Sequence, residues 1–264
     1  MDFIVDGSKA YAYTAAHDLD PARPTVVFVH GAGLDHSWWG LQSRYFGYHG
    51  FNVLACDLPG HGRSPGPPLA SVSGAADWVV RLLDVAGVPK ANVVGHSMGS
   101  LVALECAARH PDRVERIALL GTAFPMNVSD GFLDAALNND QGAYDMETIW
   151  GHAPQVPFGG NPNPGMWMYG DSLARLARLA PGVLYNDLKA CKDYSTGLES
   201  AAKVACPVLV ISGGRDMMTP PKAAAALVKA LSGATSVAIR TSGHSLMAEA
   251  PDATLDALRD FLVS

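Results

Sequence analysis

The sequence is poor in charged residues and in cysteine. Of its 264 residues, 17% are charged, and 25 acidic against 19 basic side chains give a net charge of −6. Nothing indicates a basic surface, so no nucleic-acid partner is expected. Four cysteines, Cys56, Cys106, Cys191 and Cys206, show no Cys-x-x-Cys spacing. We therefore expect small buried thiols in a reducing compartment, not disulfides or metal ligands.

Signals for export, for a membrane and for cofactors are also missing. The segment Met1–Asp6 lacks the basic and apolar regions of a signal peptide, and the apolar runs are shorter than a membrane span. We expect a cytoplasmic protein with no membrane partner, either a monomer or a homodimer. No His-Glu-x-x-His motif, phosphate loop or dinucleotide fingerprint occurs, so neither a metal nor another cofactor is expected.

Apolar residues, by contrast, are plentiful at 48% of the chain. Continuous runs rich in β-branched residues are typical of strands buried on both faces of a parallel sheet. Such strands are predicted at residues 25–29, 52–56, 91–94, 116–120, 207–211 and 235–239, after two short strands at 2–6 and 10–15. Helices are predicted at residues 37–48, 71–86, 101–110 and 251–263, with another beginning at Pro220 after a capping Thr219. This alternation predicts an α/β fold, with a mostly parallel sheet and helices on both of its faces.

The alternation of strands and helices breaks between residues 124 and 203. This segment has helix-like stretches, many aromatic and Met residues, and a Pro/Gly-rich run at Gly151–Gly165. We interpret it as an inserted, mainly helical cap on a core formed by residues 1–123 and 204–264. Most of its aromatic residues should pack within the cap, but Phe124, Trp150 and Trp167 are expected to line a substrate pocket. The Pro/Gly-rich run is a candidate for a mobile entrance.

The segment Gly95-His96-Ser97-Met98-Gly99 lies between a predicted strand and a predicted helix. This Gly-x-Ser-x-Gly pattern predicts a sharp turn with Ser97 at its apex. An apex residue is forced toward positive φ, and its neighbours two positions away must be small. The pattern alone is not specific, and a serine hydroxyl is a poor nucleophile without a base. Its interpretation therefore depends on partners elsewhere in the chain.

A base and an orienting acid should come from other strand ends, which meet at one edge of a parallel sheet. His244 follows the sixth of the buried runs and Asp216 follows the fifth, so the chain order is Ser, Asp, His. His30 and His61 lie in loops near the same edge, where tight turns favour structural roles for them. Asp57 also ends a strand, but that strand precedes the one leading to the serine.

Backbone N–H groups of Ala32 and Met98 are predicted to form an oxyanion hole. Met98 begins the helix that follows Ser97. Ala32 lies in the loop after the first buried strand, where Gly31 lets the backbone approach a substrate closely, so Gly31 is also expected to contact the substrate.

Five segments together resemble proteins of the α/β-hydrolase fold: His30-Gly31-Ala32-Gly33, Asp57-Leu58-Pro59-Gly60-His61-Gly62-Arg63-Ser64, Gly95-His96-Ser97-Met98-Gly99, Gly214-Arg215-Asp216 and Gly243-His244. The resemblance spans nearly the whole chain. It implies a serine hydrolase that cleaves a small or medium apolar carboxylic ester or lactone through an acyl-enzyme. Carbon–carbon hydrolysis, thioester hydrolysis and perhydrolysis use the same triad and stay open. A slow-turnover ligand receptor is a further alternative, whereas members with an aspartate nucleophile, such as epoxide hydrolases, are disfavoured by Ser97.

Overall fold

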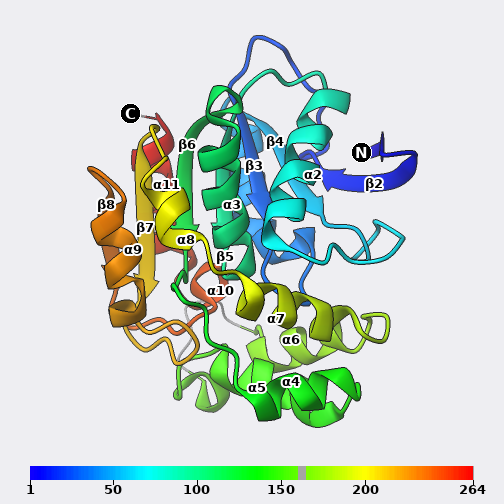
Figure 1. Ribbon diagram of the computed structural model, residues 1–264, viewed down its shortest axis with the longest axis vertical. Helices are drawn as coiled ribbons and strands as arrows, with labels where there is room; N and C mark the ends of the chain where they lie inside the picture. Colours follow the sequence, from blue (N-terminus) through cyan, green and yellow to red (C-terminus); the bar gives the residue numbers. More distant parts are fainter. Residues whose placement is uncertain (160–164, 264) are drawn as a thin grey trace.

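The structure is a computed structural model that describes residues 1–159 and 165–263. Its strands form one sheet in the order β1-β2-β4-β3-β5-β6-β7-β8 (Figure 1). Their bounds are β1 Asp2–Val5, β2 Ser8–Tyr13, β3 Thr25–Val29, β4 Asn52–Asp57, β5 Ala91–His96, β6 Val114–Leu120, β7 Val208–Gly213 and β8 Thr235–Ile239. β2 pairs antiparallel with both β1 and β4, and the other neighbours are parallel. The predicted mostly parallel sheet is confirmed.

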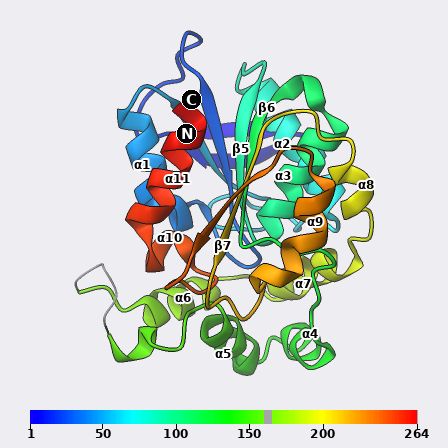
Figure 2. The same ribbon diagram turned by 90° about the vertical axis from the view of Figure 1, so that its left-hand side faces the viewer.

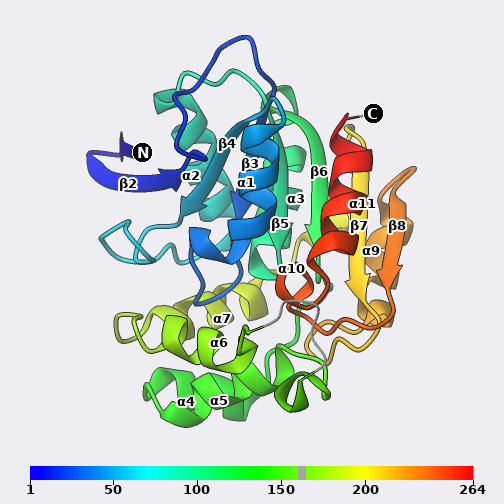
Figure 3. The ribbon, with the colours of Figure 1, turned by 180° about the vertical axis from the view of Figure 1, so that it is seen from behind.

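Helices cover both faces of the sheet. Figure 1 shows α2 (Val72–Val85) and α3 (Met98–Arg109) on one face, and Figure 3 shows α1 (Gly40–Tyr48) and α11 (Pro251–Val263) on the other. The remaining elements of this part are η1 His36–Trp39, η2 Pro111–Arg113, η4 Pro221–Ala224, α9 Ala225–Ala230 and α10 Leu246–Glu249. This layered arrangement is the predicted α/β architecture.

The two faces of the sheet explain the unbroken apolar runs. Along β3, Val27 and Val29 pack into the core beneath α2 and α3. The alternate residues Val26 and Phe28 pack into a second core with Phe46 of α1. Successive side chains of a strand point to opposite faces, so a strand covered on both sides needs apolar residues at every position.

The second strand is displaced from its predicted position. β2 begins at Ser8, directly after a turn at Asp6 and Gly7, both of which have positive φ. It ends before Ala15, whose φ of 55° interrupts the extended backbone. The strand therefore occupies Ser8–Tyr13 and not residues 10–15, because the turn that joins it to β1 is short.

The segment predicted to form the cap is helical in its described residues. Its elements are α4 Asp130–Leu137, α5 Gln141–Trp150, η3 Val156–Phe158, α6 Met168–Leu176, α7 Val183–Asp193 and α8 Gly197–Ala201. Figures 1 and 2 show α4 to α7 lying across the carboxyl ends of the parallel strands, whereas α8 packs against α3. The predicted site residues, which follow the carboxyl ends of the strands, therefore lie on the side of the sheet that this helical layer covers.

All four cysteines are free thiols, and Cys56, Cys106 and Cys191 are buried. Among the helices of residues 1–159 and 165–263, none is long and apolar enough to cross a membrane.

Candidate active site

Ser97 occupies the turn between β5 and α3 with φ 52° and ψ −119°. This region is strained for a residue that carries a Cβ. A Cβ at Gly95 would lie 1.9 Å from the carbonyl oxygen of Gly99, and one at Gly99 would lie 2.3 Å from that of Val29. Both glycines are therefore required by close backbone contacts. The turn leads directly into α3, which begins at Met98.

His244 and Asp216, from loops after β8 and β7, lie together at the same edge of the sheet. Nδ1 of His244 is 2.8 Å from Oδ2 of Asp216. Thr219 donates its hydroxyl to the same oxygen at 2.7 Å and its N–H to Oδ1 of Asp216. The prediction that Thr219 caps the next helix was wrong, because its side chain bonds Asp216 and that helix, η4, has no side-chain cap.

The backbone around His244 is held from two sides. His96 lies 2.9 Å through Nε2 from the carbonyl oxygen of His244. Glu249 accepts the backbone N–H groups of Gly243 and Ser245. These contacts fix the loop that carries the imidazole, so the orientation of the ring does not rest on Asp216 alone.

The charge of Asp216 favours the protonated form of His244. Burial would lower the pKa of His244, but the Asp216 carboxylate outweighs burial and raises that pKa. Burial would likewise raise the pKa of Asp216, yet the histidine and Thr219 lower it to about 2. The site therefore stabilises the imidazolium that forms when His244 accepts a proton.

Ser97 and His244 both lie next to the end of β6, at Leu120 and Gly121. Ser97 donates its N–H to the carbonyl oxygen of Leu120 at 2.9 Å, and a Cβ at Gly121 would lie 3.0 Å from the His244 ring. Nε2 of His244 is buried and has no hydrogen-bond partner among the described residues. The expected Ser97–His244 hydrogen bond is thus not formed here, as is common for a site without substrate.

The loop after β3 comes close to Ser97. A Cβ at Gly31 would lie 3.2 Å from Cβ of Ser97, and Ala32 lines the same cavity as Ser97. The next residue, Gly33, donates its N–H to Oδ2 of Asp187 on α7 at 2.9 Å. Met98 is the first residue of α3, where backbone N–H groups have no partner within the helix.

Ser97 opens onto a cavity of about 270 Å³. Trp150, at the end of α5, lines this cavity. The remaining wall is mostly apolar and includes Met126, Val128, Phe132, Leu188, Met217 and Met218. Such a wall suits an apolar acyl or alkyl group.

Two other residues predicted to line the pocket lie elsewhere. Phe124 packs edge-on against Tyr194, with ring centroids 5.7 Å apart, and does not line the Ser97 cavity. Trp167 is 69% exposed at the start of α6. Within the Pro/Gly-rich run predicted as an entrance, residues 160–164 lie outside the described residues.

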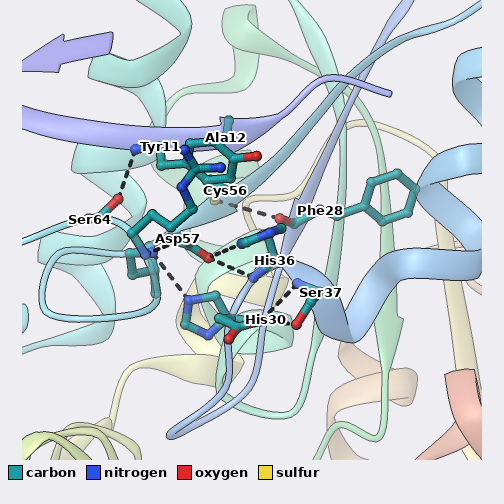
Figure 4. A network of polar contacts seen from close by, with 12 residues as sticks. Tyr11, Ala12, Phe28, His30, His36, Ser37, Cys56, Asp57 and Ser64 are labelled. Atoms are coloured by element: carbon teal, nitrogen blue, oxygen red, sulfur yellow. Dashed lines mark hydrogen bonds and ion pairs between the residues drawn. The ribbon is translucent and has the colours of Figure 1, made fainter. Parts of the chain in front are cut away.

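Asp57 is the centre of a separate hydrogen-bond network (Figure 4). Its Oδ1 accepts the backbone N–H of His36 and lies 2.8 Å from Nδ1 of that residue, while Oδ2 accepts the N–H of Arg63. Together with Asp35, these residues bring three potential metal-ligating atoms within 4.8 Å of one another. Because the Asp57 oxygens already accept three hydrogen bonds, we assign this cluster to holding the loops after β3 and β4.

His30 and His61 have structural partners. Nε2 of His30 accepts the N–H of Leu58 (Figure 4), and burial together with the charge of His61 lowers the pKa of His30 to about 4, so that it stays neutral. Nε2 of His61 lies 2.7 Å from Oδ2 of Asp187 in a buried pair. No local sequence pattern indicates this pair, because its members are far apart along the chain.

Comparison with known proteins agrees with this architecture. The profile of the alpha/beta hydrolase fold family matches residues 24–251. The chain belongs to this family. It is similar to a pimeloyl-acyl-carrier-protein methyl ester esterase of Neisseria meningitidis, with 30% identity over 252 residues that cover 92% of this chain and 95% of the relative.

Other alpha/beta hydrolases are more distant. An (E)-2-((N-methylformamido)methylene)succinate hydrolase of Acinetobacter baylyi is 24% identical over 243 residues, which cover 90% of this chain and 89% of the relative. The crystal structure of an enol-lactonase from Burkholderia xenovorans matches with a TM-score of 0.90 and 24% identity over the whole of both chains. Both curated relatives named here are hydrolases, which supports an enzyme with hydrolase activity.

Proposed function

We propose that this alpha/beta hydrolase is a serine hydrolase that cleaves a small or medium apolar carboxylic ester or lactone. The observation that carries the proposal is the placement of Ser97, strained at the sheet edge and open to an apolar cavity, beside the His244–Asp216 pair. The methyl ester esterase among the relatives supports an ester as substrate. The same groups would act on a lactone, whose reacting carbonyl is equivalent.

In the proposed acylation step, Oγ of Ser97 attacks the ester carbonyl and His244 Nε2 takes the hydroxyl proton. Asp216 holds the other ring nitrogen and stabilises the imidazolium. The carbonyl oxygen becomes negatively charged and is held by the N–H groups of Ala32 and Met98. Each such donor contributes about 3 kcal/mol of transition-state stabilisation. The alcohol then leaves with the proton from His244, and the acyl group stays on Ser97.

The test is an acyl-chain series of nitrophenyl esters with the wild type and Ser97→Ala, together with labelling by a fluorophosphonate. Multiple turnover with a preference for short or medium chains is expected, and Ser97→Ala should lose kcat by several orders of magnitude. Ser236→Ala, which changes an exposed serine on the edge strand β8, is the matched control. Full esterase activity in Ser97→Ala would contradict the proposal, and a single slow turnover by the wild type would instead favour a ligand receptor.

A further inference from the structure

A second, much smaller cavity lies beside His244. Its volume is about 20 Å³, and its lining includes His96, His152, Glu147 and His244. A cavity needs only about 10–15 Å³ on this measure to hold one water molecule. Glu147 also lines the larger cavity that contains Ser97, so this residue borders both spaces.

Trp38 also lines this cavity, and each of these five residues has a buried side-chain atom without a hydrogen-bond partner in the described part of the chain. The atoms are Nε2 of His244, Nδ1 of His96, Nε2 of His152, Oε2 of Glu147 and Nε1 of Trp38. A buried polar atom left unpaired costs about 1–3 kcal/mol. Glu147 as a residue is partly exposed, but its Oε2 atom is sealed from solvent. Five such atoms on the residues that line one water-sized cavity indicate a bound molecule that forms hydrogen bonds.

In each of the three histidines, the second ring nitrogen has a partner, and these partners determine which kind of molecule can bind. Nδ1 of His244 faces Asp216, Nε2 of His96 faces a carbonyl oxygen, and Nδ1 of His152 faces the carbonyl oxygen of Thr148. Each of these nitrogens must carry the proton, because its partner only accepts. When the rings are neutral, the three unpartnered nitrogens are therefore acceptors. Three acceptors need hydrogen-bond donors; a water molecule supplies two, and the indole N–H of Trp38 is another.

Glu147 can bond to the water in either protonation state, as an acceptor when ionised and as a donor when protonated. Burial raises the pKa of Glu147 to about 7, although the charge of His244 opposes this and Asp187 adds to it. Near neutral pH a large fraction of Glu147 therefore carries a proton and can donate it in a hydrogen bond. Burial lowers the pKa of both His96 and His152, which keeps these two rings neutral.

Glu249, by comparison, is a carboxylate that holds the local backbone through hydrogen bonds. Its two oxygens accept the backbone N–H groups of Ala153, Gly243 and Ser245. Glu147 has no hydrogen bond of this kind among the described residues. Holding the local backbone therefore does not explain why Glu147 is placed between the two cavities.

We propose that the small cavity binds the hydrolytic water of this site and that Glu147 is a positioning residue for that water. The inference rests on the proposed serine hydrolase function. In the deacylation step, Nε2 of His244 takes one proton from the water while the water oxygen attacks the acyl carbon on Ser97. The bond from that carbon to Oγ of Ser97 then breaks, His244 returns the proton to Oγ, and the carboxylic acid leaves.

Pre-steady-state kinetics with a nitrophenyl ester separate acylation from deacylation. In Glu147→Leu, the rate of the first nitrophenol burst should stay within about twofold of the wild type, while the deacylation rate falls about tenfold to a hundredfold. Glu147→Gln keeps an N–H donor and should recover most of the deacylation rate. The matched control is Asp145→Asn, which alters an exposed carboxylate on the same helix whose partner is Gln141. An equal fall in both steps, or unchanged deacylation in Glu147→Leu, would overturn the proposal.

A high-resolution crystal structure gives a test that needs no turnover. Electron density for one water within hydrogen-bond distance of Oε2 of Glu147 and Nε2 of His244 is expected, and its absence would refute the water site. Failure of the serine hydrolase function has a different signature, because Ser97 would then not react with a fluorophosphonate whether or not the water is present.

Discussion

Replacing Ser97 by glycine should relieve the backbone strain at this position. At φ 52° and ψ −119°, a residue with a Cβ carries strain on the order of 1–3 kcal/mol. Glycine removes the Cβ, but it also makes the unfolded chain more flexible, which costs about 0.5–1 kcal/mol. Ser97→Gly is therefore expected to be more stable than Ser97→Ala by about 1 kcal/mol. The alanine variant is the matched reference, since it lacks the hydroxyl but keeps the Cβ.

Thermal and denaturant unfolding measure this difference. For a chain of this size, 1 kcal/mol corresponds to a Tm difference of about 2–4 °C, so Ser97→Gly should melt that much later than Ser97→Ala. The urea midpoint should rise in the same direction with an unchanged slope. Both variants should be inactive, so any difference between them reports on the backbone and not on catalysis. A glycine variant that melts at or below the alanine variant would refute the strained-turn argument.

Three further outcomes are expected. Asp216→Asn should reduce kcat on nitrophenyl esters by about 10⁴-fold, and a loss below tenfold would exclude it as the orienting acid. The buried Asp187–His61 pair raises the pKa of His61 and lowers that of Asp187, in each case against the effect of burial. The contribution of His61 to the free energy of unfolding is complete below pH 6.5 and is lost as pH rises through its raised pKa. The contribution of Asp187 is complete above pH 3.8 and is lost as pH falls through its lowered pKa. The Tm gap between the wild type and Asp187→Asn should therefore be largest between about pH 4 and 6.5, and a gap independent of pH would contradict the ion pair. Trp150→Ala should shift the preferred acyl chain toward longer esters, whereas Trp167→Ala at the surface should not, as a chain-length series would show.

Much of the sheet could be predicted from the sequence because its signal is local. The β3 run is apolar at each position because both faces of that strand are covered, and the bounds Thr25–Val29 match the prediction. The turn at Ser97 could also be predicted, because the Gly-x-Ser-x-Gly pattern is local, although Gly99 is needed by a contact with Val29 of the neighbouring strand β3. β2 was misplaced because its start depends on a two-residue turn and not on its own pattern.

The polar contacts of the site could not be predicted in the same way. Glu147 belongs to an ordinary helical stretch, and nothing local in that stretch shows that it borders a cavity together with His244. Asp187 meets His61 across 126 residues of sequence, so neither shows a pattern that a local reading can detect. Trp167 and Trp150 are the same residue type in the same aromatic-rich segment, but Trp167 is exposed at the start of α6. Apolar character alone does not tell which side of a helical layer a residue occupies.

The contacts of Asp187 have a consequence for engineering the substrate range by exchanging helices. This one carboxylate bonds both the N–H of Gly33, next to the predicted oxyanion donor, and the ring of His61. A chimera that replaces α4 and α5 would change the cavity wall and leave this joint intact. A chimera that also replaces α7 would need an acid at the equivalent position, or the loop after β3 would lose its support. The contacts of Asp187 thus divide the helical layer into helices that can be exchanged and a helix, α7, that must be kept together with the sheet.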